Sequence, residues 1–429
     1  DLAQLLQGKL VINQVLVDHP QLTAVAKNGV WNFQPLLDLA KPNPSATVQD
    51  KPKTAFPFAQ IDIKELAIRQ ASARLDQDGK LSAHIDGLSL EARGKASLNA
   101  IDLNLKVLLN PDSGKPETPN IGFQSTGDMS FQSRVSTDLN FSASDLNRLF
   151  VSGAFGLQSN QLHMGASPLP SPDVAVEMEA KVSLQPEMLS LKKLWLSLGK
   201  NNLIKVSGSA ANFTKDPSFT LMVNKASLQL EDLLAWGKQW APPLSGRGLL
   251  KAEAVKVSGQ LPGFVLKNLN VSGGTLSAKN LWTHHPGQNT RLEDMNAEIE
   301  LKEIALHDSQ LGKAAANINM QLKKAAIQQA EIKDWNQSLD LTVNGMDEVL
   351  FKFKTDMKSV HYDHPQAKEI FLPVHAEGSG HLNKSDLNKL KLSYRLGTKA
   401  LASGTVTGTI KDFGKGSLQL KQNLSLNLA

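Results

Sequence analysis

Residues 173–184 read Asp-Val-Ala-Val-Glu-Met-Glu-Ala-Lys-Val-Ser-Leu. Every second residue of this stretch is apolar, and most residues between them are charged or polar. Because successive side chains of a β-strand point to opposite faces, this period of two predicts a strand with one apolar and one hydrated face. The predicted apolar face consists of Val174, Val176, Met178, Ala180, Val182 and Leu184.

The same alternation recurs along most of the 429 residues. Two pairs that favour hairpin turns, Asn28-Gly29 and Asp78-Gly79, interrupt it, and we expect Gly273-Gly274, Asn344-Gly345 and Gly378-Ser379-Gly380 to be similar breaks. A strand with its turn takes about 12–15 residues, so we predict about 25–30 strands, most of them antiparallel to their neighbours in sequence. Other apolar rows are Ile101, Leu103, Leu105 and Val107; Ile299 and Leu301; and Ile318, Met320 and Leu322.

Helical periodicity is rare, and we expect short helices only at residues 33–39, 144–150 and 231–240. Helices that could cover a large sheet are therefore missing from the sequence. The apolar face has to be buried against a second sheet, inside a barrel, or in a trough that holds an apolar ligand. The residue pattern alone favours trough and sandwich equally.

Residues 41–57 contain four prolines and few apolar side chains, which predicts a linker. This linker would separate an N-terminal unit of β-hairpins and a short helix (residues 1–40) from a continuous β body (residues 58–429). The chain begins with Asp1, so we expect it to be a piece of a longer protein.

Composition excludes several kinds of function. The 46 Lys and Arg residues against 41 Asp and Glu residues give a charge of only +5, and no basic run alternates with aromatic residues, so we expect no nucleic-acid partner. The absence of cysteine excludes disulfides, thiolate nucleophiles and cysteine-ligated metals. No nucleophile or phosphate-binding motif is found in a suitable context, so we expect no enzyme and no cofactor.

Two groups of polar residues are candidate sites. His284-His285 and the stretch His361-Tyr362-Asp363-His364, with His375 nearby, offer possible metal ligands, but the spacing matches no known site, and solvated loop histidines fit better. Glu177 and Glu179 share a strand face with a spacing that could suit an acid and a base, but they lie on a uniformly polar face. We therefore predict no catalytic and no metal site.

The N-terminal segment carries a family resemblance. It contains Gly8-Lys9-Leu10-Val11-Ile12, then Asp18-His19-Pro20-Gln21-Leu22, the turn Asn28-Gly29-Val30-Trp31-Asn32-Phe33 and the run Leu36-Leu37-Asp38-Leu39. This order of strand, proline, strand, Gly-x-Trp-Asn turn and short helix resembles the start of AsmA-like proteins of the Gram-negative envelope. The match is moderately specific over residues 8–90, and only the rhythm of alternation is shared beyond them.

The resemblance implies a fold and a function. The fold would be an elongated, curled antiparallel β-sheet that forms a taco-like groove with an apolar interior. The family's N-terminal inner-membrane helix is absent from this sequence, and the groove would lie in the periplasm. The expected function is non-enzymatic transport of phospholipid between inner and outer membranes, with envelope proteins as possible partners at either end. The alternative is a periplasmic scaffold or assembly factor for outer-membrane proteins. The apolar rows of residues 101–107, 174–184, 299–301 and 318–322 would line the groove.

Overall fold

The computed structural model describes residues 8–34 and 60–426, apart from short gaps, of which the longest are 111–117, 238–243, 363–371 and 412–416. The chain divides into two compact units, residues 1–200 and 201–429. The predicted linker at 41–57 lies outside the described residues, so the boundary expected there stays a prediction.

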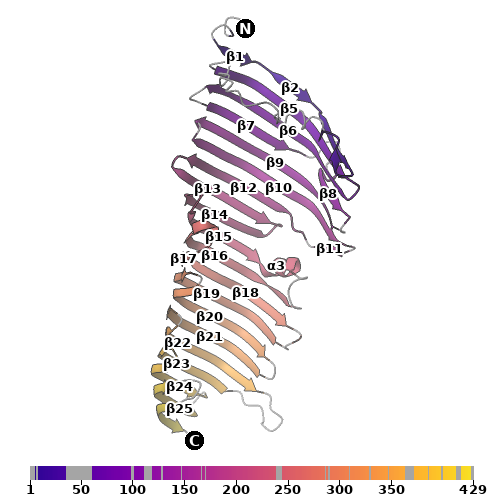
Figure 1. The fold of residues 1–429 in the computed structure, drawn as a ribbon. Coiled ribbons are helices and arrows are strands. Elements are labelled where there is room, and N and C mark those ends of the chain that lie inside the picture. The colour runs from indigo at the N-terminus through magenta and orange to yellow at the C-terminus, as the bar shows by residue number, and fades with distance from the viewer. Residues whose placement is uncertain are drawn as a thin grey trace. The chain divides into compact units, whose positions relative to one another are not determined.

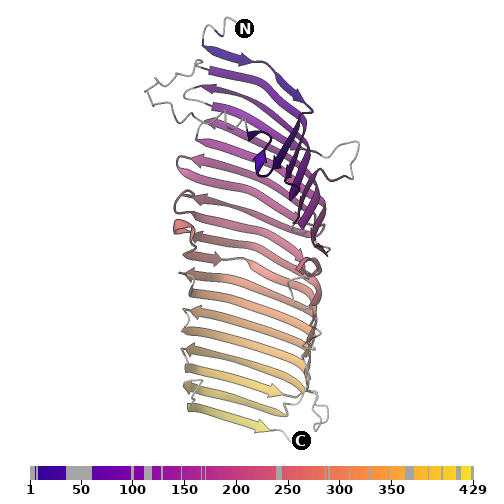
Figure 2. The same cartoon turned by 45° about the vertical axis from the view of Figure 1, so that its right-hand side comes forward.

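Unit 1 is a curled sheet of long strands, and Figure 1 and Figure 2 show these strands bending along their length. From β5 to β13 the ladders are antiparallel, as predicted, and most strands that follow in sequence pair with each other. The exceptions are β7 and β8, which both pair with β6 and β9, and β11 and β12, which both pair with β10. The strands are β1 (Lys9–Ile12), β2 (Val15–Asp18), β3 (Gln21–Lys27), β4 (Val30–Trp31), β5 (Gln60–Gln77), β6 (Leu81–Ser97), β7 (Ile101–Leu109), β8 (Ile121–Ser125), β9 (Met129–Asp145), β10 (Arg148–Met164), β11 (Ser167–Leu169), β12 (Val174–Leu184) and β13 (Glu187–Leu198).

The N-terminal edge of unit 1 departs from the antiparallel rule. Strands β1, β2 and β3 lie one after another along β5 and pair with it in parallel. The turn Asn28-Gly29 joins β3 to β4, and both of its residues have the positive φ angles that a two-residue hairpin turn requires. This hairpin was correctly predicted from the sequence.

Unit 2 is also a curled antiparallel sheet (Figure 2). Its elements are β14 (Asn202–Ala211), β15 (Ser218–Gln229), α3 (Leu230–Gly237), β16 (Ser245–Gln260), η1 (Pro262–Phe264), β17 (Asn268–Ser272), β18 (Thr275–His285), β19 (Thr290–His307), β20 (Gln310–Ile327), β21 (Ala330–Asn344), β22 (Glu348–Tyr362), β23 (Leu372–Asn383), β24 (Asp386–Leu396), β25 (Ala402–Lys411) and β26 (Ser417–Leu426). The predicted all-β, antiparallel class is thus confirmed.

One of the three predicted helices is present. Helix α3 occupies most of residues 231–240, at the end of β15, where Asp232 accepts a hydrogen bond from the buried Asn202 side chain (2.7 Å) and Glu231 accepts one from the Gly248 backbone (3.1 Å). The helix expected at 144–150 is wrong, because these residues end β9 and begin β10 in a tight hairpin. Most of the helix expected at 33–39 lies outside the described residues.

Two glycine pairs predicted as breaks have other roles. Gly273-Gly274 lies between β17 and β18, and both of these strands pair with β16 and β19, so the glycines interrupt one long strand instead of reversing it. Gly378-Ser379-Gly380 lies inside β23: all three residues pair with β22, Gly378 and Ser379 also pair with β24, and Gly380 lies at a register shift on that side. In contrast, Asn344-Gly345 does link β21 to β22, as expected.

Four neighbouring strands of unit 2 share an aligned irregularity. Each carries two consecutive polar residues where the alternation calls for one, and these pairs face each other in register. Asp294 and Asp334 have positive φ angles there. An extra residue of this kind bends and twists a strand, so the alignment creases the sheet across its strands. We call this set the bulge line; it consists of Glu293-Asp294 in β19, Lys323-Lys324 in β20, Lys333-Asp334 in β21 and Lys358-Ser359 in β22.

Candidate apolar face

The predicted apolar rows of unit 1 lie on one face of its sheet. Leu105 of β7 pairs with Phe141 of β9, which pairs with Val151 of β10; Val151 pairs with Ala180 of β12, and Ala180 with Leu191 of β13. The rows on either side are built in the same way, as in the row of Leu103, Ala143, Leu149, Val182 and Leu189. The apolar residues predicted on β7 and β12 therefore belong to one surface, although more than 60 residues separate these strands in the sequence.

Unit 2 has an apolar face of the same construction. One row runs through Ile299, Ile318, Leu339, Phe353, Gly378, Leu392 and Val406, on seven strands. The predicted residues Leu301, Met320 and Leu322 lie on the same face, in neighbouring rows. At about 3.3 Å per residue, the 18 residues of β19 extend about 60 Å. An acyl chain extends about 15 Å, half of the hydrocarbon thickness of a bilayer, so this face is wide enough for such chains in any orientation.

These faces are only partly buried in the described residues. Only twelve hydrophobic residues of this part of the chain are buried, and six of them are alanines. Among the predicted lining residues Ala180, Leu301 and Leu322 are buried, Leu184 is 51% exposed and the others are intermediate.

The opposite face of each sheet is polar. In unit 1 one row runs through Lys106, Asn140, Ser152, Glu179 and Lys193. Glu177 and Glu179, weighed above as an acid and base pair, each bind a lysine of β13: Glu177 binds Lys193, and Glu179 binds Lys192 at 2.8 Å. The polar exterior predicted for them is confirmed.

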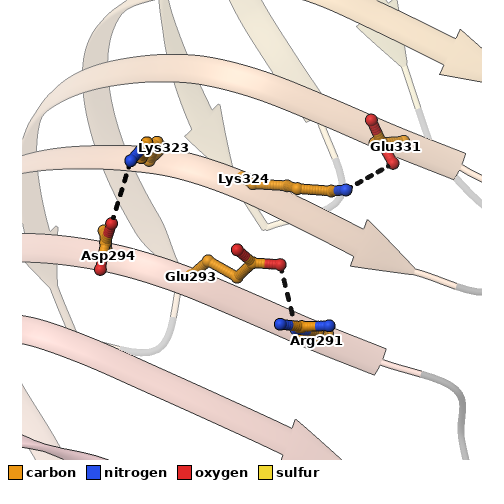
Figure 3. Close-up of polar contacts among 6 residues, drawn as sticks. All are labelled: Arg291, Glu293, Asp294, Lys323, Lys324 and Glu331. Carbon is orange, nitrogen blue, oxygen red and sulfur yellow. Dashed lines mark hydrogen bonds and ion pairs between the residues drawn. The ribbon is translucent and has the colours of Figure 1, made fainter.

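Charged pairs also follow the bulge line of unit 2 (Figure 3). Lys323 lies 3.4 Å from Asp294, Lys324 lies 2.9 Å from Glu331, and Arg291 lies 3.0 Å from Glu293. Hydrogen bonds from Lys333 and Lys324 hold the pKa of Glu331 below its ordinary value. The side chains of these pairs are 28–69% exposed to solvent, so each pair contributes little to stability.

Hollows on the polar face have mixed linings that include charged side chains. One of about 710 Å³ in unit 2 is bordered by Asp340, Lys352 and Lys391, and one of about 660 Å³ in unit 1 by Arg74 and Gln132. Apolar residues also border them, among them Phe353 and Leu392 in the first and Leu75 and Phe123 in the second, but charged side chains interrupt each lining. The polar face is therefore the weaker candidate for holding an apolar ligand.

Several residues of the apolar face were not selected from the sequence. On β13 the leucines Leu189 and Leu191 are followed by Leu194 and Leu196, a change of parity caused by the bulge at Lys192-Lys193. A strict period of two assigns the leucines after such a shift to the wrong face. The two adjacent lysines between leucines are a sequence signal of the bulge. On β10 the apolar row of Leu149, Val151 and Phe155 is masked in the sequence by glycine and serine neighbours.

The histidines lie on strands, not in the loops where they were expected. His284 and His285 end β18, His361 lies near the end of β22 and His375 lies inside β23. His375 Nδ1 contacts Asp356 on the adjacent strand. The described residues contain no cluster of three or more histidine, cysteine or acidic side chains that could hold a metal ion. His364 lies outside them.

Two tryptophans, Trp195 and Trp335, lie on opposite kinds of face. Trp195 is 36% exposed on the polar face, with the Lys193 ammonium 3.8 Å from its ring centre. Trp335 lies on the apolar face and donates a hydrogen bond to the buried Thr355 hydroxyl at 2.8 Å. Among the helices that the structure describes, none has the length and apolar character needed to span a membrane.

Comparison of the chain with protein-family models, with curated proteins and with solved structures finds no match.

Proposed function

We propose that the chain binds phospholipid on the apolar faces of its two sheets and carries it, without chemical conversion, between the inner and outer membranes of a Gram-negative envelope. The observation that supports this proposal is that each apolar face continues from strand to strand and is only partly buried in the described residues. Each methylene group removed from water contributes about 0.8 kcal/mol, so such a face favours hydrocarbon over water.

The apolar face would lie on the inside of the curl and the charged face outside. Aliphatic residues dominate the apolar face of each unit, and they offer an acyl chain similar contacts at successive strands. The free energy of the acyl chain therefore stays nearly constant along its path. A phospholipid can then keep its headgroup in water while its chains stay on protein. The resemblance of residues 8–90 to AsmA-like proteins supports the periplasmic location and the attachment to the inner membrane through a helix that precedes this sequence.

Native mass spectrometry with lipid extraction tests the proposal. We expect several phospholipids per chain in the wild type and most of them lost in Val176→Asp and Leu103→Asp, because a carboxylate on the apolar face is costly to remove from water. Matched controls place the same charge on the polar face of the same strands: Ala175→Asp and Asn104→Asp should keep their lipid.

The same comparison applies to unit 2, with Ile318→Asp as the test and Asn319→Asp as its control. Circular dichroism has to show that all variants stay folded. A folded wild type without lipid would contradict the proposal and favour the alternative function, a scaffold for outer-membrane proteins, which predicts bound protein and tolerance of these charges.

A further inference from the structure

Glycines on the apolar face of unit 2 lie opposite aromatic residues of the adjacent strand. Side chains normally stand roughly perpendicular to a sheet, so a glycine leaves a pit and a phenylalanine forms a projection. Here the two occur together as register partners. The pairs are Gly380 with Phe351, Gly378 with Phe353, Gly259 with Phe219, and Gly404 with Tyr394.

In each pair the aromatic ring covers the glycine. A Cβ atom added to Gly380 would lie 2.6 Å from Cζ and 2.9 Å from Cε1 of Phe351, and one added to Gly378 would lie 2.9 Å from Cε1 of Phe353. The end of each ring therefore reaches from β22 across β23, which means that the ring leans along the sheet. Gly380 is buried as a result.

The two phenylalanine rings form one surface. Their centres are 6.4 Å apart and their planes differ by only 25°. Next to them lie Leu339 of β21 and Leu392 of β24, in the same row as Phe353 and Gly378. Leaning rings over glycines fill the pits and lower the projections, so the apolar face keeps a more even height at β22 and β23.

Even height matters for a hydrocarbon chain that lies on this face. Dispersion contacts weaken by a quarter to a half when a gap of about 0.5–1 Å opens, so a raised ring would separate a chain from its neighbouring contacts. Resting on the function proposed above, we propose that Gly378 and Gly380 are positioning residues: they hold the Phe353 and Phe351 rings low, and the acyl chains of the bound lipid lie across these two rings.

Gly380→Ala is the sharpest test, because the atoms its methyl group would meet belong to the side chains of Phe351 and Leu387, so the ring can rise without a shift of the backbone. Gly312→Ala is the matched control. It adds the same methyl group to a strand of the same unit, where the nearest atom is the Ala305 carbonyl oxygen at 3.5 Å, an ordinary contact.

The readout is photo-crosslinking to phosphatidylethanolamine from vesicles, with p-benzoylphenylalanine placed at Leu339 beside the rings or at Ile299 two strands away in the same row. We expect Gly380→Ala to lower the crosslinking yield at position 339 by about fourfold, the effect of losing contact with roughly one methylene group. The yield at position 299 should not change, and Gly312→Ala should change neither.

A second measurement tests the geometry without lipid. Leucine at position 351 is too short to cover Gly380, so the double variant Gly380→Ala/Phe351→Leu should melt at a higher temperature than additive single effects predict. If the changes in melting temperature of the two single variants simply add in the double variant, the Phe351 ring does not cover Gly380. Equal yields at position 339 in wild type and Gly380→Ala would overturn the positioning role while lipid binding stands. No crosslinking at either position in the wild type would instead refute the proposed function itself.

Discussion

Asp62 is the most buried carboxylate among the described residues that form ion pairs, with its side chain 4% exposed on the polar face of β5. The Lys64 ammonium lies 3.0 Å and the Lys9 ammonium 3.8 Å from it, and Lys95 lies on the neighbouring strand. The hydrogen bond from Lys64, followed by the charges of the three lysines, holds the pKa of Asp62 below its ordinary value, although burial acts in the opposite direction.

This carboxylate makes the stability of unit 1 depend on pH. Since its pKa is lower in the folded state, ionised Asp62 contributes stability above the unfolded-state pKa of about 3.9, and this contribution is lost as the pH falls through the lower folded value. We expect Asp62→Asn to be less stable than wild type at pH 7 and to lose less stability on acidification. Urea denaturation between about pH 2.5 and 7 measures this. Asp340→Asn, at an exposed position, serves as control, and parallel curves for wild type and Asp62→Asn would contradict the prediction.

Asn120 takes the place of a missing stretch of strand. Between the end of β7 and the start of β8, its side chain accepts a hydrogen bond from Val135 N (2.7 Å) and donates one to Val135 O (2.9 Å), so it pairs both backbone groups of that buried residue. Asn120→Leu would leave both groups unpaired. At about 1–3 kcal/mol for each group, we expect unit 1 to lose about 2–6 kcal/mol of unfolding free energy in urea denaturation. The exposed Asn104→Leu should cost far less, and equal losses would refute this role.

Residues that belong to an alternating apolar and polar pattern could be assigned to a face of the sheet from the sequence. The apolar rows on β7, β12, β19 and β20 follow directly from the period of two. Asn120 and Gly380 could not be recognised, because their roles depend on the residue across the ladder, and the register of distant strands is not written in local sequence.

At the level of elements, the bulge line is what keeps the apolar face continuous. Leu322 and Ala325 of β20 are separated by two residues and still lie on the same face, because neighbouring strands carry the same extra residue at the same place. We expect deletion of Lys323 to put one half of β20 out of step with β19 and β21, and to destabilise unit 2 by about 4 kcal/mol or more, as for other severe core disruptions.

For the stability of unit 2, the charges on the bulge line matter less than the presence of an extra residue in each strand. Asp294 and Lys323 are 53% and 69% exposed in their side chains, so Lys323→Ser should cost about 0–1 kcal/mol. Thermal denaturation and hydrogen exchange of β19 to β21 compare the two variants. A substitution as damaging as the deletion would show that the ion pair, and not the extra residue, maintains this region.

Bulges are also where the sequence-based assignment of elements reached its limit. Paired polar residues such as Lys192-Lys193 look like the end of a strand or an irregular stretch, yet they continue it with a change of parity. The hairpin at residues 144–150 was mistaken for a helix because Ser and Asp followed by Leu also occur at helix starts, and only pairing of β9 with β10 decides between the two.

At the scale of the whole chain, the division into residues 1–200 and 201–429 predicts two folding units. Each has its own continuous ladder of strands, so we expect residues 201–429, expressed alone, to give a β-type circular dichroism spectrum and a cooperative unfolding transition. Hydrogen exchange should protect the same strands as in the full chain. An unfolded product would show that this unit requires residues 1–200 to form.

Within each unit, strands lie side by side in nearly the order in which they occur in the sequence. A chain that emerges from a narrow pore with its N-terminus first can therefore zip up hairpin by hairpin, since almost every new strand finds its partner already complete. The same order governs the response to mechanical load. Pulling on the ends of a unit would peel strands off one at a time over a long extension, so that the molecule yields gradually instead of rupturing in a single event.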